Sequence, residues 1–363
     1  MRVLVVNAGS TSLKLRFLDA NDVLLADNEL RAGRDGFDQH AVARFLADLD
    51  RVEAVGHRVV HGGPRLSTAV LLDERVERYL RSLVDLAPLH QPPALDGIDL
   101  ARRLLPGVRA VACFDTAFHA GLPPAAATYA IPEEWRDRYT LRRYGFHGLS
   151  HAYASRRAAE LLGRPGERLR IVTCHLGAGA SLAAVLDGKS VDTTMGFTPL
   201  EGLVMATRPG DVDPGLLLWL ERHGGLTEPE LSDALEHRAG LKALAGTDDM
   251  RGILARASIV GDRSRLAFDV YVHRLRAKAA AMAAAMNGLD CLVFTAGVGE
   301  NANEVRAAAA AGLGFMGVAV DPELNVSARG DADISASDAA VRTLVIRARE
   351  DLEIARQVRE VLA

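Results

Sequence analysis

A strand–turn–strand segment that could bind phosphate occurs twice in this chain. Val3–Asp19 and Ile171–Asp187 each contain an apolar run, a polar residue (Asn7 or His175), a glycine turn of small side chains, a second apolar run and a closing aspartate. Small residues in such a turn leave backbone N–H groups exposed, and a concave set of N–H groups binds phosphate. The repeat indicates a duplicated domain, with two turns that would hold a phosphate chain between them.

The first turn also carries side chains that suit a phosphate and its metal ion. Lys14 supplies a point charge to phosphate, while the oxygens of Asn7, Ser10 and Ser12 suit Mg²⁺ or its waters. Taken alone, the same residues are equally typical of an ordinary β-hairpin turn.

Charged residues also stand at the ends of two apolar runs. Arg58 lies in a run that ends at Gly62 and Gly63, and an arginine there suits bidentate binding of carboxylate or phosphate. Asp115 follows the run 110–114, at the carboxyl end of a predicted strand, where ligands bind in open α/β sheets. A helix N-cap is the alternative interpretation of Asp115.

Two loops in the second half combine charge with turn formers. Arg208 lies in the loop 205–214, which alone is typical of a salt-bridged surface loop. Gly297–Asn301 follows a predicted strand and precedes a helix, which favours a nucleotide contact at the helix N-terminus. The segment 188–190 ends like a phosphate-binding loop, but Ala183 stands where its first glycine must be, so we expect a hairpin turn there.

Strands that alternate with helices predict the α/β layers that would position these residues. The predicted strands cover residues 3–6, 13–18, 54–60, 110–114, 169–174, 181–186, 190–194, 289–295 and 341–346. The predicted helices cover residues 40–49, 75–86, 97–105, 216–221, 228–235, 265–286, 304–311 and 350–361.

Composition narrows the class of protein. A chain of 363 residues predicts two domains, and its net charge of −4 gives no support for a nucleic-acid partner. Cys113, Cys174 and Cys291 each lie in an apolar run, which favours reduced core residues. Because the apolar runs are too short for a signal peptide or a membrane span, we expect a cytoplasmic protein without a membrane partner.

Together and in this order, the motifs resemble the acetate kinase family of the sugar kinase–Hsp70–actin superfamily. The segments that carry the resemblance are 7–14, 56–63, 86–90, 114–119, 144–148, 192–201, 208–214 and 297–301. The resemblance implies an α/β fold of duplicated RNase H-like (actin-like ATPase) domains with a nucleotide cleft between them. Residues 1–118 plus 350–363 would form the N-terminal lobe, with the C-terminal helix packing back on it, and 119–349 the C-terminal, nucleotide-binding lobe.

By resemblance, this is a homodimeric enzyme that uses Mg²⁺, or Mn²⁺, and moves the γ-phosphoryl group of ATP reversibly to acetate. Direct in-line transfer would give acetyl phosphate and ADP, and the site must supply positive charge because two anions react. Three alternatives stay open. They are a propionate or butyrate kinase, an acetate kinase that uses pyrophosphate, and a non-catalytic nucleotide-dependent binding or regulatory protein on the same fold.

The resemblance also implies residue roles. Arg58 and Arg208 would hold the carboxylate and the transferring phosphoryl group, and His147 would stabilise the transition state. Asp115 matches the catalytic acid, but a carboxylate nucleophile needs no general base, so we expect Asp115 to orient an arginine or Mg²⁺. Asn7 and Glu350 match the positions associated with Mg²⁺.

The remaining implied residues bind the two substrates. Acetate would contact His90 and an apolar pocket of Val60, Leu89, Phe146 and Pro199. The nucleotide would contact Lys14, Ser10, Ser12, His175, Leu176, Gly177, Ala178, Gly179, Asp249, Met250, Arg251, Gly297, Val298, Gly299, Glu300 and Asn301. Ala178 stands where the family usually has asparagine, which removes one side-chain donor to phosphate.

Overall fold

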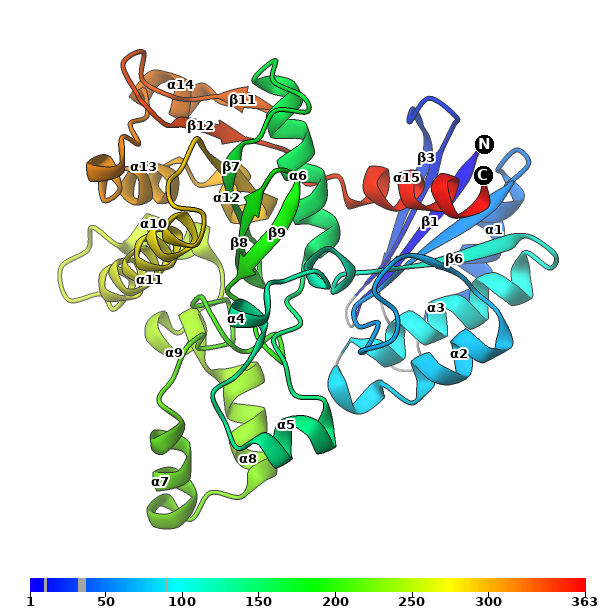
Figure 1. The fold of residues 1–363 in the computed structure, drawn as a ribbon, viewed down its shortest axis with the longest axis horizontal. Helices are drawn as coiled ribbons and strands as arrows, with labels where there is room; N and C mark the ends of the chain where they lie inside the picture. The colour runs from blue at the N-terminus through cyan, green and yellow to red at the C-terminus, as the bar shows by residue number, and fades with distance from the viewer. Residues whose placement is uncertain (10–11, 32–36, 89) are drawn as a thin grey trace. The chain divides into compact units, whose positions relative to one another are not determined.

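The computed structural model describes residues 1–9, 12–31, 37–88 and 90–363. The chain forms two compact units, which Figure 1 shows with the chain coloured from blue to red. The first unit comprises 1–120, 146–153 and 349–363, and the second comprises 121–145 and 154–348. The predicted lobes, 1–118 with 350–363 and 119–349, stay a prediction, and each compact unit is described by itself.

Each unit contains a mixed sheet, and the strands of the two sheets follow the same topology within the described residues. The first sheet has the order β3-β2-β1-β4-β6-β5, and the second, read from its other edge, has the order β9-β8-β7-β10-β12-β11. In both, three antiparallel strands are followed by two parallel strands and an antiparallel edge strand. The predicted duplication is therefore present as a duplicated topology.

The strands of the first sheet are β1 Val3–Ala8, β2 Ser12–Leu18, β3 Leu24–Arg31, β4 Ala54–Val59, β5 Val70–Leu71 and β6 Arg109–Phe114. Those of the second are β7 Arg170–Leu176, β8 Ala180–Leu186, β9 Lys189–Thr193, β10 Cys291–Thr295, β11 Ala332–Asp333 and β12 Arg342–Val345. The repeated segment forms the hairpins β1–β2 and β7–β8. Asp187 and Gly188 join β8 to β9 with φ of 53° and 71°, so the predicted hairpin turn is confirmed.

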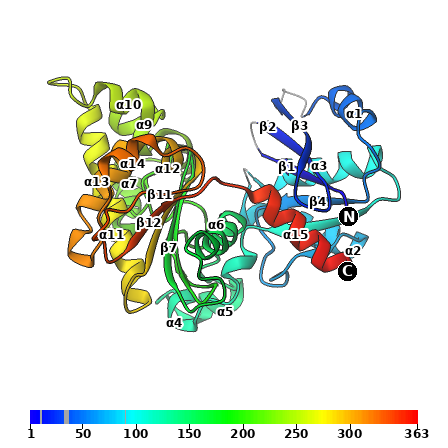
Figure 2. The same cartoon turned by 90° about the horizontal axis from the view of Figure 1, so that it is seen from above.

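Helices cover both faces of the first sheet, as Figure 2 shows from above. α15 (Glu350–Leu362) packs its Ile354 and Val358 on one face, against Val3, Val5 and Cys113. A Cβ on Gly56 would lie 2.5 Å from a methyl carbon of Ile354, so this close packing requires glycine in β4. The other face is covered by α1 (Gln39–Ala47), α2 (Glu74–Arg81) and α3 (Gln91–Leu104).

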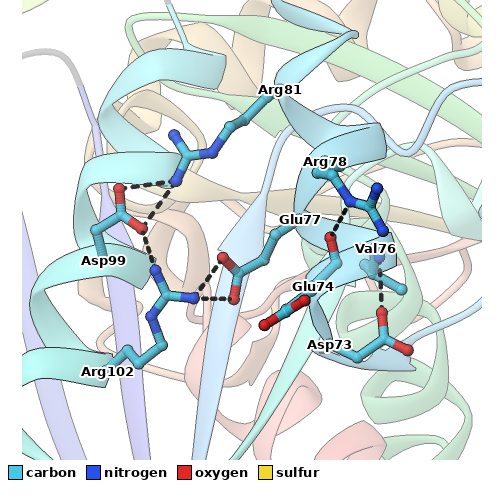
Figure 3. Close-up of polar contacts among 8 residues, drawn as sticks. All are labelled: Asp73, Glu74, Val76, Glu77, Arg78, Arg81, Asp99 and Arg102. Atoms are coloured by element: carbon cyan, nitrogen blue, oxygen red, sulfur yellow. Dashed lines mark hydrogen bonds and ion pairs between the residues drawn. The ribbon is translucent and has the colours of Figure 1, made fainter.

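The outer surfaces of α2 and α3 are joined by ion pairs, which Figure 3 shows in close-up. Arg102 donates to both carboxylate oxygens of Glu77 at 3.0 and 2.8 Å, and Arg81 donates to Asp99 at 2.8 Å. The helix predicted over 75–86 ends at Arg81, and a separate 3₁₀ turn covers Val84–Leu86. α3 begins at Gln91 rather than at 97, because two prolines occupy its first turn, where a missing N–H costs nothing.

The second unit carries most of the helices, and α11 (Ser264–Ala285) packs on β7 and β8. α6 (Gly148–Leu161) has residues 148–153 in the first unit and the rest in the second. The others are α4 Pro124–Ala127, α5 Glu133–Tyr139, α7 Pro214–Gly224, α8 Glu228–Asp233, α9 Gly240–Ala245, α10 Met250–Arg256, α12 Ala296–Asn301, α13 Asn303–Ala311 and α14 Pro322–Ser327.

Two further findings bear on the predictions from composition. Cys113, Cys174 and Cys291 are free and buried, as predicted. Within the described ranges, the structure has no helix that combines the length and the apolar surface needed to cross a bilayer.

Candidate active site

Arg58 is the centre of a polar cluster in the first unit. Its Nε and Nη2 donate to the two carboxylate oxygens of Asp115 at 3.2 and 2.6 Å, and its Nη1 donates to Asn7 Oδ1 at 3.3 Å. Glu350 Oε2 lies 3.7 Å from Arg58 Nε and accepts from Asn7 Nδ2 at 3.4 Å. Because β1, β4 and β6 are parallel neighbours, their carboxyl ends bring these residues to one edge of the sheet.

The cluster is removed from solvent, and burial governs its electrostatics. Asp115 is 1% exposed, and burial raises its pKa to about 6 against the opposing charge of Arg58, with the like charge of Glu350 adding to the increase. Burial alone would lower the pKa of Arg58, but the charges of Asp115 and Glu350 outweigh burial and raise it. Asp115 therefore forms a bidentate pair with Arg58, and Arg58 stays cationic.

The donor set of this cluster fits Mg²⁺. In the described part of the chain, no group of three or more His, Cys, Asp or Glu side chains is arranged to hold a metal ion. Asp115, Glu350 and Asn7 nevertheless present carboxylate and amide oxygens around one guanidinium, so two negative charges face one positive charge. Mg²⁺ is usually held by one or two carboxylates together with substrate phosphates, and these oxygens suit it.

His147 directly precedes α6 and lies beside the backbone of Asp115. Its φ is +56°, a left-handed conformation that side chains adopt reluctantly and that is concentrated at functional sites. The next residue, Gly148, donates its N–H to Asp115 O at 2.9 Å, and a Cβ there would lie 2.2 Å from that oxygen. The ring centroid of His147 lies 6.5 Å from that of His151. The structure thus brings His147 and Asp115 together through Gly148.

Two residues of the first unit that were predicted to contact the substrate are buried, and each lies within two positions of Arg58 or His147 in the sequence. Val60 is 6% exposed and Phe146 is 2% exposed, and the Phe146 ring meets His61 edge-on at 5.6 Å. His90 directly precedes α3 and is half-buried. Leu89 lies outside the described residues.

The β1–β2 hairpin contains three residues that were predicted to contact the nucleotide, and the structure describes two of them. Lys14 pairs across the sheet with Glu29 at 3.4 Å, and both side chains are about half exposed or more, so this ion pair holds Lys14 weakly. Ser12 accepts the Gly9 N–H at its carbonyl oxygen at 2.8 Å. Ser10 lies outside the described residues.

Arg208 lies in the second unit, in a loop tied to the repeated turn 177–179. The N–H of Met205 donates to Arg208 O, and the N–H of Ala206 donates to Ala178 O at 3.1 Å. The Arg208 side chain donates to Pro199 O at 2.9 Å, and no carboxylate of the described residues lies within ion-pair distance of it. Burial lowers the pKa of Arg208, and the negative charge of Glu236 opposes this shift only in part.

The predicted nucleotide segments of the second unit meet at the ends of β7 and β10. His175 is in register with Thr295, and Gly177 faces Ala296. Ala296 begins α12 with φ +65°, another strained non-glycine residue. Leu176 and Gly299 are buried, whereas Gly297 has open space at its Cβ position.

The other nucleotide residues have separate contacts. Asn301 donates to Gly297 O at 2.8 Å, and Glu300 accepts from the Ala348 N–H at 2.9 Å. Asp249 caps α10 by accepting from the Arg251 N–H at 3.2 Å, and these two side chains form an exposed ion pair around the buried Met250. The side-chain contacts of Asp249 and Arg251 thus do not bring them to the turn 177–179 or to α12.

Sequence reasoning missed a buried arginine behind α12. Arg306 is 2% exposed and donates to Gly299 O, Glu300 O and both oxygens of Asn325 at 2.7–2.9 Å. It therefore holds the last carbonyls of α12, the segment expected to bind nucleotide. The one signal available was a charged residue inside the alanine-rich run 303–311.

Comparisons with known proteins agree on one family. The model of the Acetokinase family matches residues 35–356. An acetate kinase of Synechococcus sp. is 51% identical over 312 residues, covering 86% of this chain and 77% of that protein. The crystal structure of Porphyromonas gingivalis acetate kinase has a TM-score of 0.91 at 36% identity and covers all of both chains. A propionate kinase from Francisella tularensis has a TM-score of 0.92 at 33% identity over 99% of each chain.

Proposed function

The chain belongs to the Acetokinase family and phosphorylates acetate with ATP, and we propose that it does so by direct in-line transfer, with the roles given below. One observation carries this mechanism: Arg208 is a half-buried guanidinium that makes no ion pair among the described residues, and the charge of Glu236 compensates it only in part. A buried unpaired cation is costly, and an anionic substrate would relieve that cost. Such a residue is suited to an acyl carboxylate or a transferring phosphoryl group.

In this mechanism an acetate oxygen attacks the γ-phosphorus, and the bond to the β,γ-bridging oxygen breaks as ADP leaves. No proton moves, so Asp115 holds Arg58 in place rather than acting as a base. Arg58 and Arg208 neutralise the reacting anions, and His147 donates to the transferring group. Asn7, Asp115 and Glu350 would hold Mg²⁺, which supplies further positive charge to the phosphates when bound.

The substrates would be recognised by different kinds of contact. The backbone N–H groups of Ala178, Gly179 and the segment 297–301 bind phosphates, since the N–H of Gly177 already donates to Gly179 O. Further nucleotide contacts come from His175, Lys14, Ser12 and Asp249–Arg251. Acetate would be contacted by His90, Val60, Phe146 and Pro199. A pocket of this kind discriminates one methylene by only about 1–3 kcal/mol, so rates on acetate, propionate and butyrate measure its size.

The test is acetate- and Mg²⁺-dependent release of ADP from ATP, with the acyl phosphate trapped as its hydroxamate. We expect both products in equal amounts and neither without acetate. Nucleotide binding without hydroxamate would instead support the non-catalytic alternative. Pyrophosphate in place of ATP, in the same assay, tests the alternative donor.

We also propose that the enzyme is a homodimer that pairs through α7. All residues of α7 are described and none is buried, and Leu216, Leu218 and Trp219 are 48%, 60% and 57% exposed. Asp213 stands at its N-terminus and Arg222 at its C-terminus, so an antiparallel copy would bring opposite charges together. Trp219→Glu should convert a dimer to a monomer in sedimentation; an unchanged mass would contradict this surface.

A further inference from the structure

We propose that Tyr129, Arg143 and Glu201 form a positioning cluster that sets the orientation of Arg208 through the segment 196–201. The cluster is made of residues in the second unit alone, and none of them was assigned a role by the sequence motifs. The inference rests on the proposed role of Arg208 and adds the residues that prepare it for its substrate.

Arg143 ties the end of β9 to the segment 196–201. Its Nη1 donates to the carbonyl oxygens of Thr193, Thr194 and Met195 at 3.0–3.3 Å, and its Nη2 donates to Glu201 Oε1 at 2.5 Å. Its side chain is only 17% exposed. The planar guanidinium makes this possible, because it offers five N–H donors in a fixed geometry that lysine cannot reproduce.

Tyr129 occupies the other oxygen of the same carboxylate. Its hydroxyl donates to Glu201 Oε2 at 2.5 Å and accepts the Phe197 N–H at 2.8 Å, while Arg143 lies over its ring at 5.5 Å from the centroid. A Cβ on Gly196 would come within 2.2 Å of the Tyr129 hydroxyl, so this carboxylate and hydroxyl pack directly on the backbone. Both ends of the segment are therefore fixed.

The fixed segment contacts the Arg208 side chain through one carbonyl group. Pro199, between Phe197 and Glu201, accepts from Arg208 Nη1 at 2.9 Å. Among the described residues this is the one hydrogen bond of the Arg208 side chain, and the remaining N–H groups of its guanidinium stay available for an anion. A shift of Pro199 O would therefore redirect the whole guanidinium.

The cluster also controls charge. Both oxygens of Glu201 are engaged, by Arg143 and by Tyr129, although Glu201 lies only two residues from Pro199. With both oxygens engaged, the Glu201 carboxylate forms no ion pair with Arg208 among the described residues. The negative charge that does act on Arg208 is that of Glu236, and it offsets the effect of burial only in part. The arrangement thus leaves the Arg208 guanidinium available for an anion.

The test is a double-mutant cycle in the full-length enzyme. Tyr129→Phe removes one hydroxyl, and we expect kcat to fall about tenfold while KM for ATP changes less than about twofold. In the Arg208→Ala background the same substitution should have no further effect on kcat, because the cluster acts through Arg208. Tyr139→Phe, at an exposed position in the same unit, is the matched control and should leave kcat unchanged.

Glu201→Gln provides a second variant that keeps the shape of the side chain and removes its charge. We expect it to lower kcat in the wild-type background and not in the Arg208→Ala background. Equal losses in both backgrounds would overturn the proposal, since they would show a structural role independent of Arg208. Absence of acyl phosphate formation in the unmodified enzyme would instead contradict the proposed function.

Discussion

The first unit surrounds Arg58 with acids, whereas the second unit leaves Arg208 with a carbonyl group. Arg58 makes a bidentate pair with Asp115 and lies 3.7 Å from Glu350, whereas the Arg208 side chain makes one hydrogen bond within the described residues, to Pro199 O. A paired arginine is fixed in orientation and its charge is largely compensated. An unpaired buried arginine keeps its attraction for an anion, so the two arginines are prepared for different parts of the reaction.

The largest expected effect separates activity from stability at Arg208. Arg208→Ala should lower turnover by about 10²–10³, the loss typical of removing one transition-state donor. The midpoint of urea unfolding should not fall, because no ion pair is broken. Steady-state kinetics and unfolding of the same variant check both statements. A loss of turnover below tenfold would contradict the role of Arg208 as a transition-state donor.

Arg58→Ala, unlike Arg208→Ala, should lower the stability of the protein. It leaves Asp115 buried without its partner, so we expect the free energy of unfolding to fall by about 3–5 kcal/mol. Arg102→Ala is the matched control, because Arg102 also makes a bidentate pair, with Glu77, but is 57% exposed. The control should lose about 1 kcal/mol or less, and similar losses for both variants would remove the contrast.

Acid should destabilise the first unit more than the second. Burial lowers the pKa of His57 to about 3 and those of His61 and His119 to about 4, from an ordinary value of 6.5. Their contribution to stability is complete above about pH 6.5 and is lost as the pH falls toward the folded values, because the unfolded chain then binds more protons. The raised pKa of Asp115 acts in the opposite direction between about pH 6 and 4.

The net result is a loss of about 3 kcal/mol per pH unit between about pH 6 and 4. Urea unfolding at a series of pH values measures how the free energy of unfolding depends on pH. In hydrogen exchange at pH 5, peptides of the first unit should exchange before those of the second. His57→Gln should reduce the number of protons taken up on unfolding by about one, and the slope in proportion. His273→Gln, at an exposed position of α11, is the control and should leave the slope unchanged. Equal exchange in both units would contradict the comparison.

The pH dependence of activity should follow Asp115. Below its pKa of about 6 the carboxyl group is protonated and its pairing with Arg58 weakens, so kcat/KM should fall about tenfold per pH unit. Asp115→Asn should remove this dependence along with most of the activity. Arg208→Lys should retain it, since Arg208 has no titrating partner within ion-pair distance among the described residues.

The smallest expected effect concerns the repeated turn beside Arg208. Ala178 is exposed at the tip of the turn, and its carbonyl already accepts from Ala206. Ala178→Asn adds a side-chain donor and should tighten ATP binding by about tenfold or less, as one hydrogen bond to a charged group allows. Calorimetry with ATP measures this, and unchanged or weaker binding would show that the turn grips phosphate through its backbone alone.

The fold was predictable where apolar runs mark the strands. The repeat at 7–19 and 175–187 predicted the duplicated topology, and β1, β2, β4 and β7 lie where their runs indicated. β3 was missed because its residues are exposed or half-buried and its sequence is polar. α6 was missed for a related reason, since its residues show little amphipathic pattern.

The site was predictable where residues belong to motifs and not where they act alone. Arg58, Asp115 and Asn7 belong to motifs and lie in one cluster with Glu350, although Asn7 and Glu350 are 343 positions apart. Arg306 and Tyr129 were missed because each is an isolated residue whose partners are backbone groups or distant side chains. Glu201 lies inside the motif segment 192–201 but was given no role of its own. Only the folded chain shows which carbonyl group a buried arginine reaches.

The position of α15 sets an order of assembly during synthesis. α15 covers Val3, Val5 and Gly56 of the first sheet, but residues 349–363 leave the ribosome after the whole of 121–348. The unit that is translated first is therefore completed last, and one face of its sheet stays uncovered while the other unit folds. Exposed apolar surface of this kind attracts chaperones and favours aggregation, so the rate of translation through the second unit controls how long the nascent chain is vulnerable.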